Sequence, residues 1–161
     1  MDLIYKKSDP SDIDILTETR IEVLRAANRL SADVDMSEVR RESYAHYERA
    51  LANNTHTAYL VYDGNAVVGA GGVSFFQVMP TYHNPSGNKA YIMNMYTHPD
   101  YRRKGIAFKV LDMLVKECYA RNITAISLEA TDMGWPLYEK YGFIKMEHEM
   151  ELPKIQNGER K

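Results

Sequence analysis

The chain has 161 residues, of which 45% are hydrophobic and 26% charged, proportions typical of a globular protein large enough to bury a core. Its formal net charge of -2 argues against a general nucleic-acid binder, and no apolar run approaches the roughly 18 residues of a membrane-spanning helix. The single cysteine, Cys118, excludes an internal disulfide and a multi-cysteine zinc site, and the N-terminus lacks the order of a secretory signal, so we expect a cytoplasmic protein.

The first third of the chain is predicted to form a strand and two helices. Leu3–Lys7 is a short strand candidate, and Ser11 and Asp14 are spaced as a helix-capping pair. Apolar residues at helical spacing follow, and a second helix is predicted to begin at Ser37. The polar segment that joins the two helices, Asn28–Met36, is expected to border a pocket.

An antiparallel region occupies the middle of the chain. Ala58–Tyr62 and Ala66–Val78 are rich in strand-forming residues, and the Asp-Gly-Asn turn between them is a strong hairpin signal. Glycines within the second of these strands suggest a bulge or a close backbone approach. A loop with two prolines, Met79–Lys89, leads to a third strand, Ala90–Thr97.

The last third alternates strands and helices. The clearest helix runs from Arg103 to Ala120, and a buried-type strand, Thr124–Ala130, follows it. A short helix is predicted around Pro136–Lys140, and strict apolar and polar alternation predicts a final strand over Phe143–Leu152. We expect a single domain over residues 1–153, with residues 154–161 as a flexible tail.

These elements predict an α/β (α+β) fold with a single mixed, mostly antiparallel sheet, flanking helices and a β-α-β-α-β C-terminal half. The strand–helix–strand crossover places the turn at Arg102–Ala107 at the carboxyl end of a strand, where open α/β sheets bind ligands. Three adjacent cations and the free N–H groups of a helix start meet in this turn, and Gly105 allows close backbone approach. The turn is therefore a candidate phosphate site.

Two motifs in this order resemble the GCN5-related N-acetyltransferase (GNAT) family, whose members transfer acetyl from acetyl-coenzyme A to an amine. The residues 102–107, Arg-Arg-Lys-Gly-Ile-Ala, match the family signature Gln/Arg-x-x-Gly-x-Gly/Ala at the start of the long helix. The second signature, Pro-Leu-Tyr-Glu-Lys-Tyr-Gly-Phe, follows at residues 136–143. The resemblance covers essentially the whole chain and implies the GNAT fold.

The resemblance implies acetyl-coenzyme A as co-substrate and no metal. The pyrophosphate would lie on the N–H groups of the signature turn, and the pantetheine arm would pair with the preceding strand as an added strand would. The cofactor-binding residues implied in this way are Met95, Tyr96, Thr97, Arg102, Arg103, Lys104, Gly105, Ile106, Ala107 and Phe108.

Tyr138 stands at the position of the family's general acid, which protonates the departing thiolate of coenzyme A. The general base is less evident, because Asn94 stands where many relatives have a carboxylate. Glu129 is the best remaining candidate, and His83, His98 or a chain of waters are weaker ones.

The resulting functional hypothesis is an N-acetyltransferase that acetylates a small-molecule primary amine by direct attack in a ternary complex. The alternatives are a non-catalytic acyl-coenzyme A sensing module and an acetyltransferase for protein N-termini or lysines. Acceptor contacts are expected from the first two helices, their joining segment and the Thr81–Asn88 loop. The sequence leaves open the acceptor, acetyl versus a longer acyl group, and the oligomeric state, although an exposed last strand would allow a homodimer.

Overall fold

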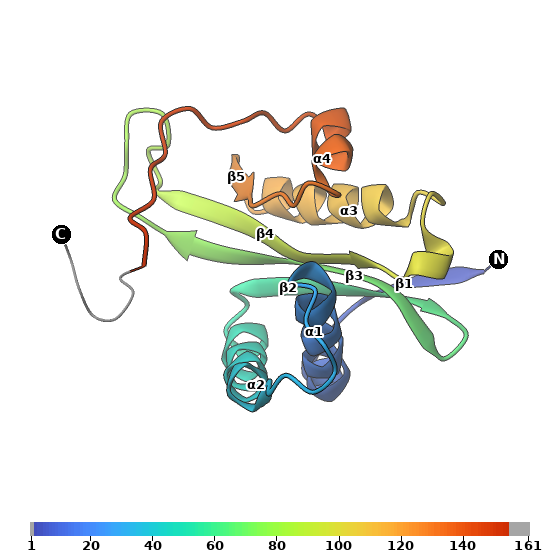
Figure 1. Cartoon of the computed structure of the whole chain (residues 1–161). Helices are drawn as coiled ribbons and strands as arrows, with labels where there is room; N and C mark the ends of the chain where they lie inside the picture. Colours follow the sequence, from blue (N-terminus) through green and yellow to red (C-terminus); the bar gives the residue numbers. More distant parts are fainter. Residues whose placement is uncertain (1, 155–161) are drawn as a thin grey trace.

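A five-stranded sheet with the strand order β1-β2-β3-β4-β5 forms the centre of the protein (Figure 1). The computed structural model describes residues 2–154. The first four strands pair antiparallel and β4 pairs parallel with β5, so the mixed, mostly antiparallel sheet of the sequence prediction is confirmed. The strands are β1 Leu3–Lys7, β2 His56–Asp63, β3 Ala66–Gln77, β4 Asn88–Thr97 and β5 Ala125–Leu128.

Two pairs of helices cover the two faces of the sheet (Figure 1). On one face lie α1, Ile13–Ala27, and α2, Ser37–Ala52, and on the other lie α3, Ile106–Ala120, and α4, Trp135–Tyr141. Each face has its own buried apolar cluster, because each strand of the sheet sends alternate side chains to opposite sides. None of the helices within residues 2–154 has the length and apolar character that a membrane crossing requires.

The start of the first helix is capped two residues earlier than the sequence predicts. A short 3₁₀ turn, Pro10–Asp12, precedes α1, and the Asp9 carboxylate accepts a hydrogen bond of 2.8 Å from the Ser11 N–H. Asp12 in turn accepts one of 2.9 Å from the Asp9 N–H. The capping pair is therefore Asp9 and Asp12, with the expected spacing, and the prediction of Ser11 and Asp14 was wrong because the turn begins at Pro10.

The final strand predicted over Phe143–Leu152 is not present. These residues form no strand, and the apolar positions that would face a core are open to solvent, with Ile144 88% and Met150 98% exposed. Alternation is only a local signal, whereas a strand requires a hydrogen-bonded partner at its side. Of the predicted tail, residues 155–161 lie outside the described part of the chain.

This assignment predicts contrasting effects of two leucine truncations. Leu111 on α3 is completely buried, whereas Leu152 is 72% exposed. Leu111→Ala is expected to lower the free energy of unfolding by about 2–5 kcal/mol, and Leu152→Ala by less than about 0.5 kcal/mol. Urea denaturation of both variants tests the assignment, and a large loss in Leu152→Ala would mean that the segment is packed after all.

Candidate active site

Strand β4 continues past the end of β5, so part of its edge has no partner strand among residues 2–154. The parallel pairing joins Lys89–Ile92 to Ala125–Leu128 and stops there. On the opposite edge, the pairing with β3 shifts register around Gly71, and Asn94 adopts a left-handed conformation with φ 60°. Such a bulge increases the local twist and bends the strand. Along Met93–Thr97, the edge on the β5 side is therefore available to an extended ligand.

The turn between β4 and α3 contains two left-handed residues, Arg103 with φ 63° and Gly105 with φ 79°. These residues delay the start of α3 to Ile106, three residues later than the sequence predicts. Within residues 2–154, no backbone or side-chain acceptor pairs with the N–H groups of Arg103, Lys104 or Gly105. A Cβ at Gly105 would meet nothing within 4 Å, so the space beside this residue is open. The turn fits a phosphate-like anion.

Side chains adjacent to the open edge of β4 point to opposite faces of the sheet. The Met95 thioether lies against Gly71 on the α3 side, and the Tyr96 hydroxyl donates a hydrogen bond of 2.9 Å to Glu22 of α1. Burial and this hydrogen bond raise the pKa of Tyr96 to about 12. The Thr97 hydroxyl is buried without a hydrogen-bond partner in the described part of the chain. At this edge of β4, the backbone N–H and C=O groups are therefore what a ligand could bind.

Tyr138 lies in α4, on the face of the sheet that α3 covers. Its ring is half-buried and contacts the edge of the Phe143 ring, with 6.2 Å between the ring centroids. Burial raises the pKa of the Tyr138 phenol, so the group is protonated at neutral pH. None of the side-chain hydrogen bonds within residues 2–154 uses this hydroxyl, which leaves it available as a donor to a ligand.

Glu129 follows β5 and is exposed. It lies beside Tyr91 of β4, where burial of the phenol and then the charge and hydrogen bonding of Glu129 raise the tyrosine pKa. Glu129 is not among the residues that line the pocket at the bulge, so the structure does not bring it together with that pocket.

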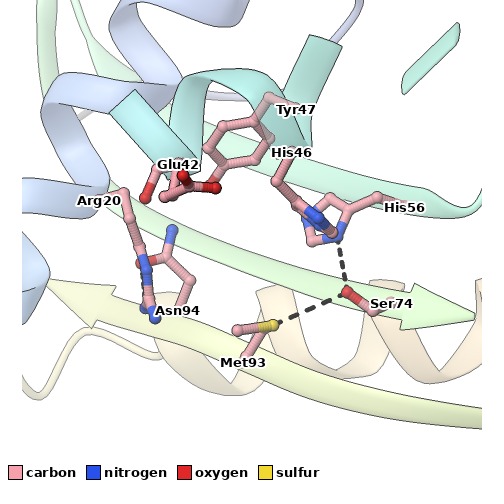
Figure 2. A pocket seen from close by; sticks show the side chains of 9 residues that line it. Arg20, Glu42, His46, Tyr47, His56, Ser74, Met93 and Asn94 are labelled. Atoms are coloured by element: carbon pink, nitrogen blue, oxygen red, sulfur yellow. Dashed lines mark hydrogen bonds between the residues drawn. The ribbon is translucent and has the colours of Figure 1, made fainter. Parts of the chain in front are cut away.

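A pocket of ≈ 230 Å³ opens beside the β4 bulge, between the sheet and the two N-terminal helices. Figure 2 shows Arg20 and Asn94 on one side of it and His46 and His56 on the other. Residues of α1 and α2 line this pocket, whereas neither Asn28–Met36 nor the Thr81–Asn88 loop contributes to it. Its lining consists of Arg20, Glu42, Ser43, His46, Tyr47, His56, Ser74, Met93 and Asn94.

Two histidines of this pocket were missed by the sequence analysis. His56 at the start of β2 lies over Gly72 of β3, where a Cβ would come within 2.8 Å of the His56 Nε2. The His56 Nδ1 lies 3.0 Å from the Ser74 hydroxyl. The His46 ring packs edge-on against the His56 ring, with 5.4 Å between the ring centroids. The glycines of the second hairpin strand were the only sequence signal for this contact. They indicated that some group approaches the backbone closely, but they did not identify that group as His56.

Both histidines are neutral at physiological pH. Burial, together with the positive charges that His46 and Arg20 can carry, lowers the pKa of His56 to about 4. Burial also lowers the pKa of His46, and the charges of Arg49 and Arg20 add to this effect. The pocket therefore contains two uncharged imidazole rings beside one guanidinium.

The low pKa of His56 predicts a loss of stability in acid. Between its ordinary pKa of 6.5 and the folded value of about 4, the unfolded chain binds a proton at His56 that the folded chain does not. The free energy of unfolding therefore decreases as the pH falls through this window, by about 3 kcal/mol in total.

Urea denaturation at pH 7.5 and pH 4.5 measures this component of stability. His56→Gln is expected to remove it, so that the variant loses less stability than the wild type between the two pH values. His83→Gln, which changes an exposed histidine in the β3–β4 loop, serves as the control and should retain the full pH dependence. Equal pH dependence in all three proteins would contradict the assignment.

Comparison with known proteins identifies the family. Residues 22–143 match the family model described as the acetyltransferase (GNAT) family. A solved structure of a predicted acetyltransferase with acetyl-CoA from Clostridium acetobutylicum is 35% identical and aligns with a TM-score of 0.86, covering 94% of this chain and 96% of that one. A GCN5-related N-acetyltransferase from Ralstonia eutropha JMP134 is 22% identical and shares the fold, with a TM-score of 0.83 and coverage of 95% and 99%.

Among curated proteins, the human cysteine-rich protein 2-binding protein is 33% identical over 65 residues. That match spans 40% of this chain but only 8% of the human protein. The family match extends from α1 through α4 and so includes both the signature turn and Tyr138. This chain therefore belongs to the GNAT family of acetyltransferases.

Proposed function

We propose that this protein transfers acetyl from acetyl-coenzyme A to the primary amine of a small molecule, by direct attack within a ternary complex. The observation that carries the proposal is the position of two potential binding regions at one bulge. The open edge of β4 leads to the free N–H groups before α3, and the pocket reaches the same strand at Asn94. This arrangement suits two substrates that meet at β4.

Acetyl-coenzyme A is proposed to bind along β4 and the turn that follows it. The backbone of Met95, Tyr96 and Thr97 would pair with the pantetheine arm, as in strand addition. The N–H groups from Arg103 to Phe108 would hold the pyrophosphate, while Arg102, Arg103 and Lys104 add positive charge. The relative from Clostridium acetobutylicum, whose structure contains acetyl-CoA, supports this co-substrate.

Tyr138 is proposed as the general acid. As the amine nitrogen bonds to the acetyl carbon and the carbon–sulfur bond breaks, the departing thiolate requires a proton. The Tyr138 phenol is protonated at neutral pH, and no other side chain within residues 2–154 is hydrogen-bonded to its hydroxyl, so it is suited to donate that proton.

Two groups are candidates for the general base that takes a proton from the attacking amine. Glu129 is the candidate from sequence, and His46 is favoured by its place in the pocket and its neutral ring. Replacement of the true base, by Glu129→Gln or His46→Gln, is expected to lower kcat/KM about 10²–10⁴-fold and to remove the acidic limb of the pH–rate profile. The variant that retains this limb identifies the group that is not the base.

Asn94 lends some support to a second candidate function, a non-catalytic acyl-coenzyme A sensor. It stands where a carboxylate base is often found, but in this structure it forms the bulge and accepts a hydrogen bond from Arg20. An asparagine tolerates the left-handed conformation well, which accounts for its presence without reference to catalysis. We therefore favour the enzyme.

Thermal unfolding with acetyl-coenzyme A, coenzyme A and ATP tests the proposed co-substrate. A ligand present at 100 times its Kd stabilises the folded state by about 2.7 kcal/mol, which shifts the unfolding midpoint visibly. Both coenzyme A species are expected to raise the midpoint and ATP is not. Thiol release with a panel of amines then distinguishes the enzyme from the sensor, since a sensor binds the co-substrate without turnover.

A further inference from the structure

The guanidinium of Arg20 lines the pocket and forms no ion pair with the described part of the chain. Its side chain is half-buried, and the one side-chain hydrogen bond that it forms with described residues goes to the Asn94 Oδ1, at 3.2 Å. Within residues 2–154 no carboxylate lies within 4 Å of it. A guanidinium has five N–H donors, so most of those of Arg20 are free for a ligand. Burial of such a cation is costly unless an anion compensates it.

The other charges of the pocket restrict which anion fits. Among the described residues that line the pocket, Arg20 is the one arginine or lysine. The two imidazoles are neutral, and Glu42 contributes a carboxylate at the exposed rim. A phosphate monoester, with nearly two negative charges, would be only half compensated and would face Glu42. A carboxylate, with one charge and two oxygens, matches a single guanidinium in charge and geometry.

The remaining walls restrict the rest of the ligand. On the side away from Arg20 lie the rings of His46 and His56 (Figure 2). The Tyr47 ring and the Met93 thioether also line the pocket, so its walls suit an apolar or aromatic group. Its volume of ≈ 230 Å³ is below the roughly 300–1,000 Å³ that is usual for drug-sized ligands. The pocket therefore fits a compact molecule.

We propose that the acceptor is an α-amino acid with an apolar or aromatic side chain, whose carboxylate is bound by Arg20. The inference rests on the proposed function, because it takes the bulge at Asn94 as the place where the amine meets the acetyl group. Arg20 is hydrogen-bonded to that residue, so an anion on Arg20 lies next to the reaction. Carboxylate and amine must then be separated by few bonds, as they are in an α-amino acid.

Matched pairs of amines test the role of the carboxylate. L-Leucine and L-phenylalanine are compared with isoamylamine and phenethylamine, which lack the carboxylate, in an assay of thiol release from acetyl-coenzyme A. The amino acids are expected to have a kcat/KM about 100-fold higher than the matched amines, as for a charged hydrogen-bonded contact. Arg20→Gln should reduce this preference to less than about fivefold. Arg20→Lys, which retains the charge but not the two parallel N–H donors of the guanidinium, should give an intermediate preference.

Arg40→Gln is the matched control, because Arg40 is paired with Glu18 and lies outside this pocket. It should retain the full preference for amino acids. Equal use of amino acids and simple amines by the wild type, or an equal loss for both in Arg20→Gln, would overturn the inference. A preference for glucosamine 6-phosphate over glucosamine, without one for amino acids, would overturn it as well.

A binding measurement separates this inference from the proposed function. In the presence of coenzyme A, L-phenylalanine is expected to raise the unfolding midpoint of the wild type and of Arg40→Gln, but not that of Arg20→Gln. If the amino acid binds in this way but no amine is acetylated, the acetyltransferase proposal fails and the site assignment stands. If simple amines are acetylated but the amino acid neither binds nor reacts preferentially, only the site assignment fails.

Discussion

Tyr138→Phe is expected to lower kcat by about 10²–10⁴-fold while the affinity for acetyl-coenzyme A remains nearly unchanged. The substitution removes the proton donor but retains the ring, which is half-buried and contacts Phe143. The Tyr138 hydroxyl takes part in no other side-chain hydrogen bond in the described part of the chain, so stability should change little. Steady-state rates and a titration of acetyl-coenzyme A separate the two effects.

The pH dependence provides a second test of the same residue. A general acid must be protonated, so activity is lost as the pH rises through its pKa, which burial raises above 10 for Tyr138. Tyr138→Phe should abolish this basic limb. Tyr141→Phe is the control, since Tyr141 belongs to the same helix and donates its hydroxyl to Asp112 at 2.8 Å. Near-normal turnover in Tyr138→Phe would exclude Tyr138 as the acid.

Gly105→Glu is expected to weaken the binding of acetyl-coenzyme A by more than about 100-fold. The added carboxylate would enter the open space beside Gly105 and would repel the phosphates from the N–H groups that are proposed to hold them. The fold should suffer much less, because a Cβ at this position meets nothing within 4 Å. The left-handed φ of 79° costs only about 1–2 kcal/mol in a residue with a Cβ.

The hairpin turn between β2 and β3 offers a closely matched control. Gly64 also has a left-handed φ, of 61°, and a Cβ there would likewise meet nothing within 4 Å, but it lies outside the turn that precedes α3. Gly64→Glu should therefore lose similar stability and retain the affinity for acetyl-coenzyme A. Isothermal titration and urea denaturation measure both quantities, and retained binding in Gly105→Glu would place the phosphate site elsewhere.

Most elements of the fold were predicted correctly because their signals are local. The hairpin at Gly64 follows from its turn residues, and α3 follows from the spacing of apolar residues such as Val110, Leu111 and Leu114. The strand over Phe143–Leu152 was predicted wrongly from an equally local signal. Its alternation is intact, but a strand forms only when it pairs with a neighbouring strand, and alternation alone does not provide that pairing.

One part of the candidate site was predicted from the sequence and another part was not. The turn at Gly105 was located from sequence, because a glycine, adjacent cations and a helix start are contiguous there. The pocket was not, since Arg20, His46, His56 and Asn94 come from α1, α2, β2 and β4. Each of these residues taken alone is ordinary in a sequence of this composition.

The sequence by itself determined the order of the elements, the mixed sheet and the position of the turn before α3, because periodicity and turn chemistry act between neighbouring residues. The tertiary structure decided that, within residues 2–154, the β5-side edge of β4 is unpaired beyond Ile92, and that the pKa of His56 falls to about 4. It also decided that Arg20 faces the pocket and pairs with no carboxylate in the described part of the chain. These properties depend on packing and solvent exclusion between distant segments, which arise only once the sheet has brought those segments together.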